Sequence, residues 1–124
     1  MRDYLTVPEA LSIRESLTAR YGGTPGVRDL EALEAALNRP LTMYYDDVAA
    51  EAAALWQSLS EEQVFFDGNK RTAFALVYTF LLINGVEMRV REEDAYQFVV
   101  ELYQAQAISS RELAERLRCH IVEE

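Results

Sequence analysis

The sequence predicts an all-α protein in which about six helices pack around one central, buried helix. Residues 72–84 carry no charge and are apolar on nearly every face, which is typical of a helix enclosed on all sides. Apolar residues recur at helical spacing in five further segments. Few stretches have the alternating pattern of a strand, so we expect an orthogonal helical bundle with almost no sheet.

Composition limits the class of protein. The chain has 124 residues, half of them hydrophobic, and we expect one domain spanning 1–124. A net charge of −9 argues against general nucleic-acid binding, since phosphate backbones attract basic surfaces. The single cysteine, Cys119, excludes an internal disulfide. The chain shows no signal-peptide pattern and no apolar run of ~20 residues, so we expect a cytoplasmic protein that does not enter a membrane.

The first two helices have clear start signals. Thr6 can cap a helix that has proline in its first turn and Glu9 three residues after the cap, and this helix should end near Tyr21. The glycine-rich stretch 22–26 then breaks the chain. Asp29 is the expected cap of a second helix, whose buried face carries leucine and alanine.

The remaining elements are read from the same signals. Residues 40–45 follow a proline and are rich in β-formers, which favours an extended segment or short flap. Asp46 or Asp47 should cap a third helix that contains Trp56 as a core residue. After Gly85, a connection over 86–90 leads to a fifth helix. A capping box that starts at Ser109 should open the last helix.

The central helix is preceded by a polar turn, Asp67-Gly68-Asn69-Lys70-Arg71. The first N–H groups of a helix have no partner within it, and the helix dipole adds positive charge there. With Gly68 allowing close approach and two cations alongside, this turn suits phosphate. Asp67 would repel phosphate unless a divalent cation lay between them, so the residues suggest a magnesium–nucleotide site. The alternative is a capped helix with a solvated charge cluster.

Other kinds of site lack their signatures. The sequence contains no Gly-x-x-x-x-Gly-Lys-(Ser/Thr) phosphate loop and no Gly-x-Ser-x-Gly nucleophile turn. The only histidine, His120, neighbours Cys119, but no further residues have zinc-ligand spacing.

The polar turn belongs to a longer pattern that is similar to a known family. Residues 65–73 read Phe-x-Asp-Gly-Asn-Lys-Arg-Thr-Ala. This resembles the signature His-x-Phe-x-Asp-(Gly/Ala)-Asn-Lys-Arg-Thr-Ala of the Fic/Doc family, in its death-on-curing (Doc) branch. Gly26-x-Arg28-Asp29 and Arg39-Pro40 resemble that family as well. The adenylylating Fic branch has glycine where this chain has Lys70.

The resemblance implies an activity and its residues. Phe65 would anchor the loop and Asp67 would hold magnesium. The backbone of Gly68 and Asn69, with the side chains of Lys70 and Arg71, would clamp the phosphates of ATP or another nucleotide. The Doc branch phosphorylates a hydroxyl of a protein of the translation machinery, with a threonine of elongation factor Tu as the known type of target. Segment 40–45 would be the flap that aligns this target, or else cover for the core.

A partner is also implied. Fic proteins often carry an inhibitory helix marked (Ser/Thr)-x-x-x-Glu-(Gly/Asn), which this sequence lacks. Inhibition should therefore come from a separate antitoxin, as in Phd–Doc pairs.

The sequence departs from the family at Gln63, where the catalytic histidine is expected. A side-chain amide cannot act as a general base near neutral pH. The catalytic positions would be Gln63, Asp67, Lys70 and Arg71, with the first of them unable to take a proton. The chain is then either a disarmed toxin or a natural, catalytically degenerate member. The alternatives in function are an AMP-transferring Fic enzyme and a non-catalytic nucleotide- or protein-binding module.

Overall fold

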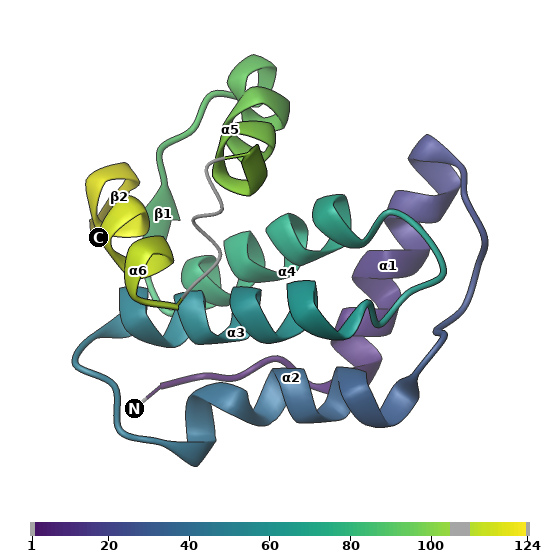
Figure 1. The fold of residues 1–124 in the computed structure, drawn as a ribbon, viewed down its shortest axis with the longest axis horizontal. Helices are drawn as coiled ribbons and strands as arrows, with labels where there is room; N and C mark the ends of the chain where they lie inside the picture. The colour runs from purple at the N-terminus through teal and green to yellow at the C-terminus, as the bar shows by residue number, and fades with distance from the viewer. Residues whose placement is uncertain (1, 105–109, 124) are drawn as a thin grey trace.

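A computed structural model describes residues 2–104 and 110–123. The described part confirms the all-α class, with six helices and one very small sheet (Figure 1). In chain order the elements are α1 (Val7–Tyr21), α2 (Leu30–Thr42), α3 (Val48–Glu62), α4 (Asn69–Ile83), β1 (Val86–Met88), α5 (Glu92–Gln104), α6 (Ser110–His120) and β2 (Ile121–Glu123). None of these helices is both long and apolar enough to cross a membrane.

The most enclosed helix is α3 rather than α4. Nine residues of α3 are buried against six of α4, and α3 packs against α2, α4 and α6. Its alanines allow neighbouring helices to approach closely, while Trp56, fully buried as expected, fills the space beside Phe74. Helix α4, expected at the centre, is buried along one side as far as Leu81, while Leu82 and Ile83 at its end are exposed.

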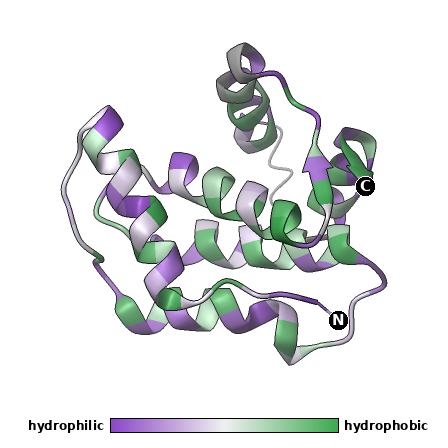
Figure 2. Cartoon of the chain, turned by 180° about the vertical axis from the view of Figure 1, so that it is seen from behind, coloured by the Kyte–Doolittle hydropathy of each residue, from purple (hydrophilic) through white to green (hydrophobic). Residues whose placement is uncertain are grey.

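Helix α1 lies across the ends of the other helices near the point where α3 stops (Figure 1). The predicted capping box is present, since Thr6 accepts from the Glu9 N–H and the Glu9 carboxylate accepts from the Thr6 N–H. Figure 2 shows hydrophilic residues spread along α1, in keeping with a surface helix. One of them, Arg14, is nevertheless only 4% exposed, and it turns inward toward the loop before α4.

One local prediction is wrong in part, and one predicted connection contains a strand that was not foreseen. The segment from Pro40, expected to be extended, is helical as far as Thr42, and Met43, which follows the helix, has an extended backbone. Pro40 has no backbone N–H and donates no helix hydrogen bond. The helix tolerates this because Pro40 lies in the last turn of α2. The expected connection at 86–90 contains β1, which pairs antiparallel with β2 and places Val86 opposite Glu123.

The helix starts agree with the capping signals. Asp29 caps α2 by accepting from the Ala32 N–H, and Asp47 rather than Asp46 caps α3 by accepting from Ala50. Gly85, with φ +76°, follows the end of α4 as predicted. The capping box expected at Ser109 lies outside the described residues.

Candidate functional site

The loop between α3 and α4 begins with Gln63 in an unusual conformation. Gln63 ends α3 with φ 46° and ψ 58°, and it is the only residue other than glycine with positive φ in the described part of the chain. This left-handed conformation costs about 1–2 kcal/mol for a residue with a side chain. The Gln63 carbonyl accepts from Arg28 Nε at 3.1 Å, while its side chain is exposed. Position 63 is thus held by its backbone and leaves its side chain in solvent.

The next residues fix the loop from two sides. Val64 and Phe65 are buried, and the Val64 carbonyl accepts from the backbone N–H groups of Arg28 and Asp29 at 3.0 and 3.1 Å. On the other side, Asn69 Oδ1 accepts from the Phe65 N–H and Asn69 Nδ2 donates to the Phe65 carbonyl, both at 2.9 Å. The side chain of Asn69 is therefore used to shape the loop.

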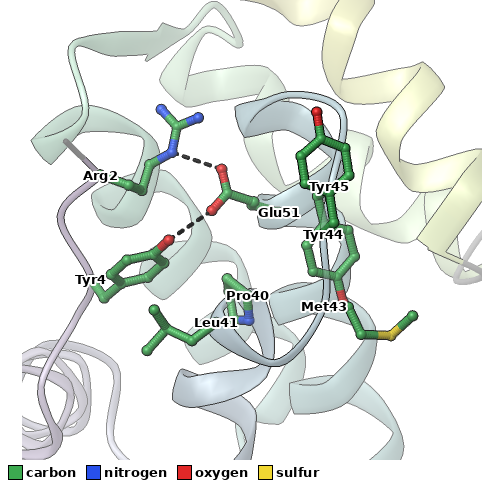
Figure 3. A pocket seen from close by; sticks show the side chains of 8 residues that line it. All are labelled: Arg2, Tyr4, Pro40, Leu41, Met43, Tyr44, Tyr45 and Glu51. Atoms are coloured by element: carbon green, nitrogen blue, oxygen red, sulfur yellow. Dashed lines mark hydrogen bonds and ion pairs between the residues drawn. The ribbon is translucent and has the colours of Figure 1, made fainter.

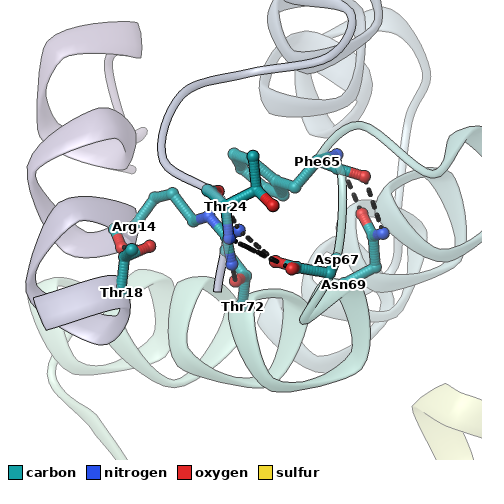
Figure 4. A network of polar contacts seen from close by, with 7 residues as sticks. All are labelled: Arg14, Thr18, Thr24, Phe65, Asp67, Asn69 and Thr72. Carbon is teal, nitrogen blue, oxygen red and sulfur yellow. Dashed lines mark hydrogen bonds and ion pairs between the residues drawn. The ribbon is translucent and has the colours of Figure 1, made fainter. Parts of the chain in front are cut away.

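Arg14 is the centre of a polar network beneath this loop (Figure 4). Its Nη2 donates to Asp67 Oδ1 at 2.8 Å and to the Thr24 carbonyl at 3.0 Å, and its Nη1 donates to Thr72 Oγ1 at 3.1 Å. The guanidinium also lies over the Phe65 ring, 5.0 Å from the centroid. One buried cation therefore joins α1, the loop after α1, the loop between α3 and α4 (residues 63–68, the motif loop) and α4.

Asp67 is held in place and kept ionised. Besides Arg14, its carboxylate accepts from the Thr24 N–H, at 3.3 Å to Oδ1 and 3.1 Å to Oδ2. The Arg14 hydrogen bond first, and the Thr24 N–H second, lower the pKa of Asp67 below its ordinary 3.8. With 47% of its side chain exposed, the carboxylate is anchored to the protein and still open to solvent.

Gly68 is required by the fold itself. It caps α4 with φ +61°, and a Cβ at this position would lie 2.9 Å from Arg14 Nη1. We expected glycine here to admit a ligand, but the side where a Cβ would project faces Arg14. No side chain caps α4, so its first N–H groups remain available to an anion.

The two cations of the motif point to different sides of the helix start. Lys70 Nζ lies 4.9 Å from the ring centroid of Tyr103, and Arg71 Cζ lies 4.3 Å from that of Tyr21. Both side chains are exposed. Lys70 is also the only lysine in the sequence. The structure therefore brings Asp67, Lys70 and Arg71 to one end of α4.

Segment 40–45 does not join this group. It precedes the start of α3, whereas Gln63 follows the end of that helix, and 15 residues of helix span roughly 22 Å. A pocket of about 530 Å³ lies beside this segment, where Glu51 Oε2 accepts from Arg2 Nε at 2.7 Å and Glu51 Oε1 accepts from Tyr4 Oη at 3.0 Å (Figure 3). The segment that lies beside the motif loop is instead 24–29.

The sequence analysis missed Arg14, Thr24 and Tyr21. A signal for Arg14 was present, because it falls one helical turn after Ala10 on the buried side of α1, where an apolar residue is expected. Neither Thr24 nor Tyr21 carried such a signal. In the described residues no group of three or more His, Cys, Asp or Glu side chains could hold a metal ion, so Asp67 would need oxygens from a ligand to do so.

This arrangement, a helical bundle in which α4 begins at a Gly-Asn-Lys-Arg turn and has no side-chain cap, agrees with the comparison to known families. Residues 4–81 match the model of the Fic/DOC family, and the chain belongs to that family. It is 46% identical over 88 residues to "Toxin Doc" of Mycolicibacterium smegmatis, covering 64% of this chain and 68% of the relative. It is 28% identical over 89 residues to "Protein kinase doc" of Escherichia phage P1, covering 68% of this chain and 71% of the relative.

Proposed function

We propose that this chain is a Doc-type toxin whose site at the start of α4 takes a nucleotide with magnesium and transfers its terminal phosphate to a protein hydroxyl. In its present form Gln63 impairs the transfer step. The observation that carries the proposal is the uncapped N-terminus of α4, flanked by an ionised Asp67 and by Lys70 and Arg71.

Each residue has a role that its geometry supports. The first N–H groups of α4 would accept phosphate oxygens, and Lys70 and Arg71 would leave their tyrosine rings to neutralise the phosphate charge. Asp67 would hold magnesium together with phosphate oxygens, and the metal would supply further positive charge to the transferring group. Asn69 would contribute through its backbone, since its side chain is bonded to Phe65.

The weak step is proton removal. In the transfer, the target hydroxyl oxygen forms a bond to the terminal phosphorus, the bond from that phosphorus to the bridging oxygen breaks, and the nucleoside diphosphate leaves. The hydroxyl proton needs a base, and the Gln63 amide cannot take it. Histidine is among the residues that tolerate the left-handed conformation best, so the backbone at position 63 suits the family histidine.

The wider role rests on the relatives. One relative is named a toxin, which supports a separate, Phd-like antitoxin as partner and a target in the translation machinery, similar to elongation factor Tu. The other relative is named a protein kinase, which supports ATP as the phosphate donor and phosphate rather than AMP as the transferred group. With a net charge of −9, the chain would act on a protein rather than on nucleic acid.

Binding can be tested through the single lysine. An amine-reactive acyl probe can label only Lys70 and the α-amino group, so mass spectrometry of tryptic peptides reads Lys70 directly. We expect ATP with magnesium to protect Lys70 and to leave the α-amino group unprotected. Asp67→Asn should reduce the magnesium-dependent part of the protection, because asparagine keeps one oxygen to accept from Arg14 but loses the charge. An unchanged labelling rate at saturating ATP would refute the site.

Catalysis can be tested by restoring the base. Gln63→His should raise phosphate transfer by ~100- to 10,000-fold, the usual contribution of a general base, and should arrest growth of a bacterial host. Gln97→His, a surface change on α5, is the matched control and should do neither. Mass spectrometry of the modified target distinguishes added phosphate from added AMP. If Gln63→His modifies no protein in a lysate with labelled ATP and does not slow growth, a non-catalytic binding module is the better account.

A further inference from the structure

Tyr21 places an exposed aromatic ring beside the candidate phosphate site. It is the last residue of α1 and 51% exposed, and Arg71 Cζ lies 4.3 Å from its ring centroid. Figure 1 shows the end of α1 close to the start of α4. A large exposed aromatic ring next to a helix start is an observation that the phosphate chemistry does not explain.

The ring that holds the other cation differs from it. Tyr103 is half-buried, and its hydroxyl is hydrogen-bonded to Ser60 Oγ at 2.6 Å. It can orient Lys70, but its contacts with α3 leave little ring surface for a ligand. Tyr21 is the more exposed of the two rings, although Arg20 Cζ also lies over it, 5.2 Å from the centroid.

Phosphate binding would expose the ring of Tyr21 further. A cation–π contact at an exposed site is weak, whereas a guanidinium binds phosphate through two parallel, charge-assisted hydrogen bonds. A phosphate at the start of α4 should draw Arg71 away from Tyr21, because the stronger contact replaces the weaker one. The part of the ring that Arg71 covers would then be open to the rest of the nucleotide, while Arg20 remains the one other cation seen over the ring among the described contacts.

We propose that Tyr21 is the stacking platform for the nucleobase of the bound nucleotide, a role that rests on the proposed phosphate site. The ring face offers no hydrogen-bond donor or acceptor, and stacking on such a face tolerates every base. The site should therefore accept ATP and GTP with similar affinity, and it should gain affinity from having a base at all.

The test compares a ligand with a base and one without. Calorimetry with magnesium measures ATP and inorganic triphosphate binding to the full chain and to Tyr21→Ala, Tyr21→Phe and the control Tyr44→Ala, an exposed tyrosine at the far end of α3. Tyr21→Ala should weaken ATP binding by about 5- to 150-fold, the range for loss of one base–aromatic stack, and leave triphosphate binding unchanged. Tyr21→Phe and Tyr44→Ala should change neither.

Each other result overturns the proposal in a recognisable way. Equal changes for ATP and triphosphate in Tyr21→Ala would mean that Tyr21 acts only by orienting Arg71. No change for ATP would mean that the base lies elsewhere. If the unmodified chain binds ATP but not triphosphate, or binds neither, the proposed phosphate site itself fails. Urea unfolding of Tyr21→Ala and Tyr21→Phe checks that both remain folded.

Discussion

Replacing Arg14 with methionine should destabilise the protein more than any other change to a charged side chain of the motif loop region. Methionine keeps most of the buried volume and removes the cation. The substitution deletes every hydrogen bond that joins α1 to the loop at Thr24, to Asp67 and to Thr72. Because these partners come from three different segments, the loss removes the contacts that hold the motif loop against α1 and α4.

The expected cost follows from the burial of each partner. The bonds to the Thr72 hydroxyl and the Thr24 carbonyl come from a charged donor and contribute roughly 1.5–3 kcal/mol each. The Asp67 carboxylate is 47% exposed and regains water, so its contact adds little. Removing a buried guanidinium whose Nε has no partner offsets part of this sum, by about 1–3 kcal/mol. The free energy of unfolding should fall by about 2–3 kcal/mol.

Urea unfolding and calorimetry measure this cost. We expect a fall in Tm of roughly 6–12 °C. The matched control is Arg39→Met, which removes an exposed arginine from the end of α2 and should stay within about 0.5 kcal/mol of the parent. A loss for Arg14→Met no larger than that of the control would refute the reasoning from the network.

Three further predictions concern neighbouring features. Gly68→Ala should lower the free energy of unfolding, measured in urea, by about 2–3 kcal/mol, since alanine would be strained at φ +61° and its Cβ would press on Arg14. Three hydrogen-bonded neighbours hold Arg14 in place, so a neutral result would show that Arg14 can move aside. Gln63→Gly should stabilise the chain by up to about 1 kcal/mol, since glycine adopts the left-handed conformation without strain, and destabilisation would indicate an unrecognised side-chain contact. The Arg118 hydrogen bond lowers the pKa of Asp47 below its ordinary 3.8, so this contribution to stability is complete above pH 3.8 and is lost as the pH falls through the lower, folded-state value. Asp47→Asn, which keeps a capping oxygen, should therefore show a shallower loss of stability in acid, and an unchanged pH profile would exclude this ion pair as a source of acid sensitivity.

Features of the fold that depend on neighbouring residues were predictable from the sequence. The Thr6–Glu9 capping box, the Asp29 cap and the stop at Gly85 are each decided within a few residues, and the structure confirms them. The polar turn at 67–71 was recognisable for the same reason.

Features that depend on distant residues were not predictable. The β1–β2 pairing joins Met88 to Ile121, and three-residue strands give no periodic signal of their own. Arg14 and Asp67 are 53 positions apart, so no local pattern relates them. At Pro40 the local rule was overridden, because packing of α2 against α3 continues the helix past the proline.

The structure also changes how the motif should be interpreted chemically. Asn69 and Asp67 have hydrogen-bond partners within the fold, and a side chain at Gly68 would clash with Arg14, so replacing any of the three disturbs the loop as well as a ligand. Lys70 and Arg71 contact only exposed or half-buried rings among the described contacts, which makes their substitution the cleaner probe of binding. Lys70→Ala should therefore lower nucleotide affinity with or without magnesium while leaving the free energy of unfolding within about 0.5 kcal/mol. If calorimetry showed full affinity in a stably folded Lys70→Ala protein, the helix N-terminus would not be where the phosphates bind.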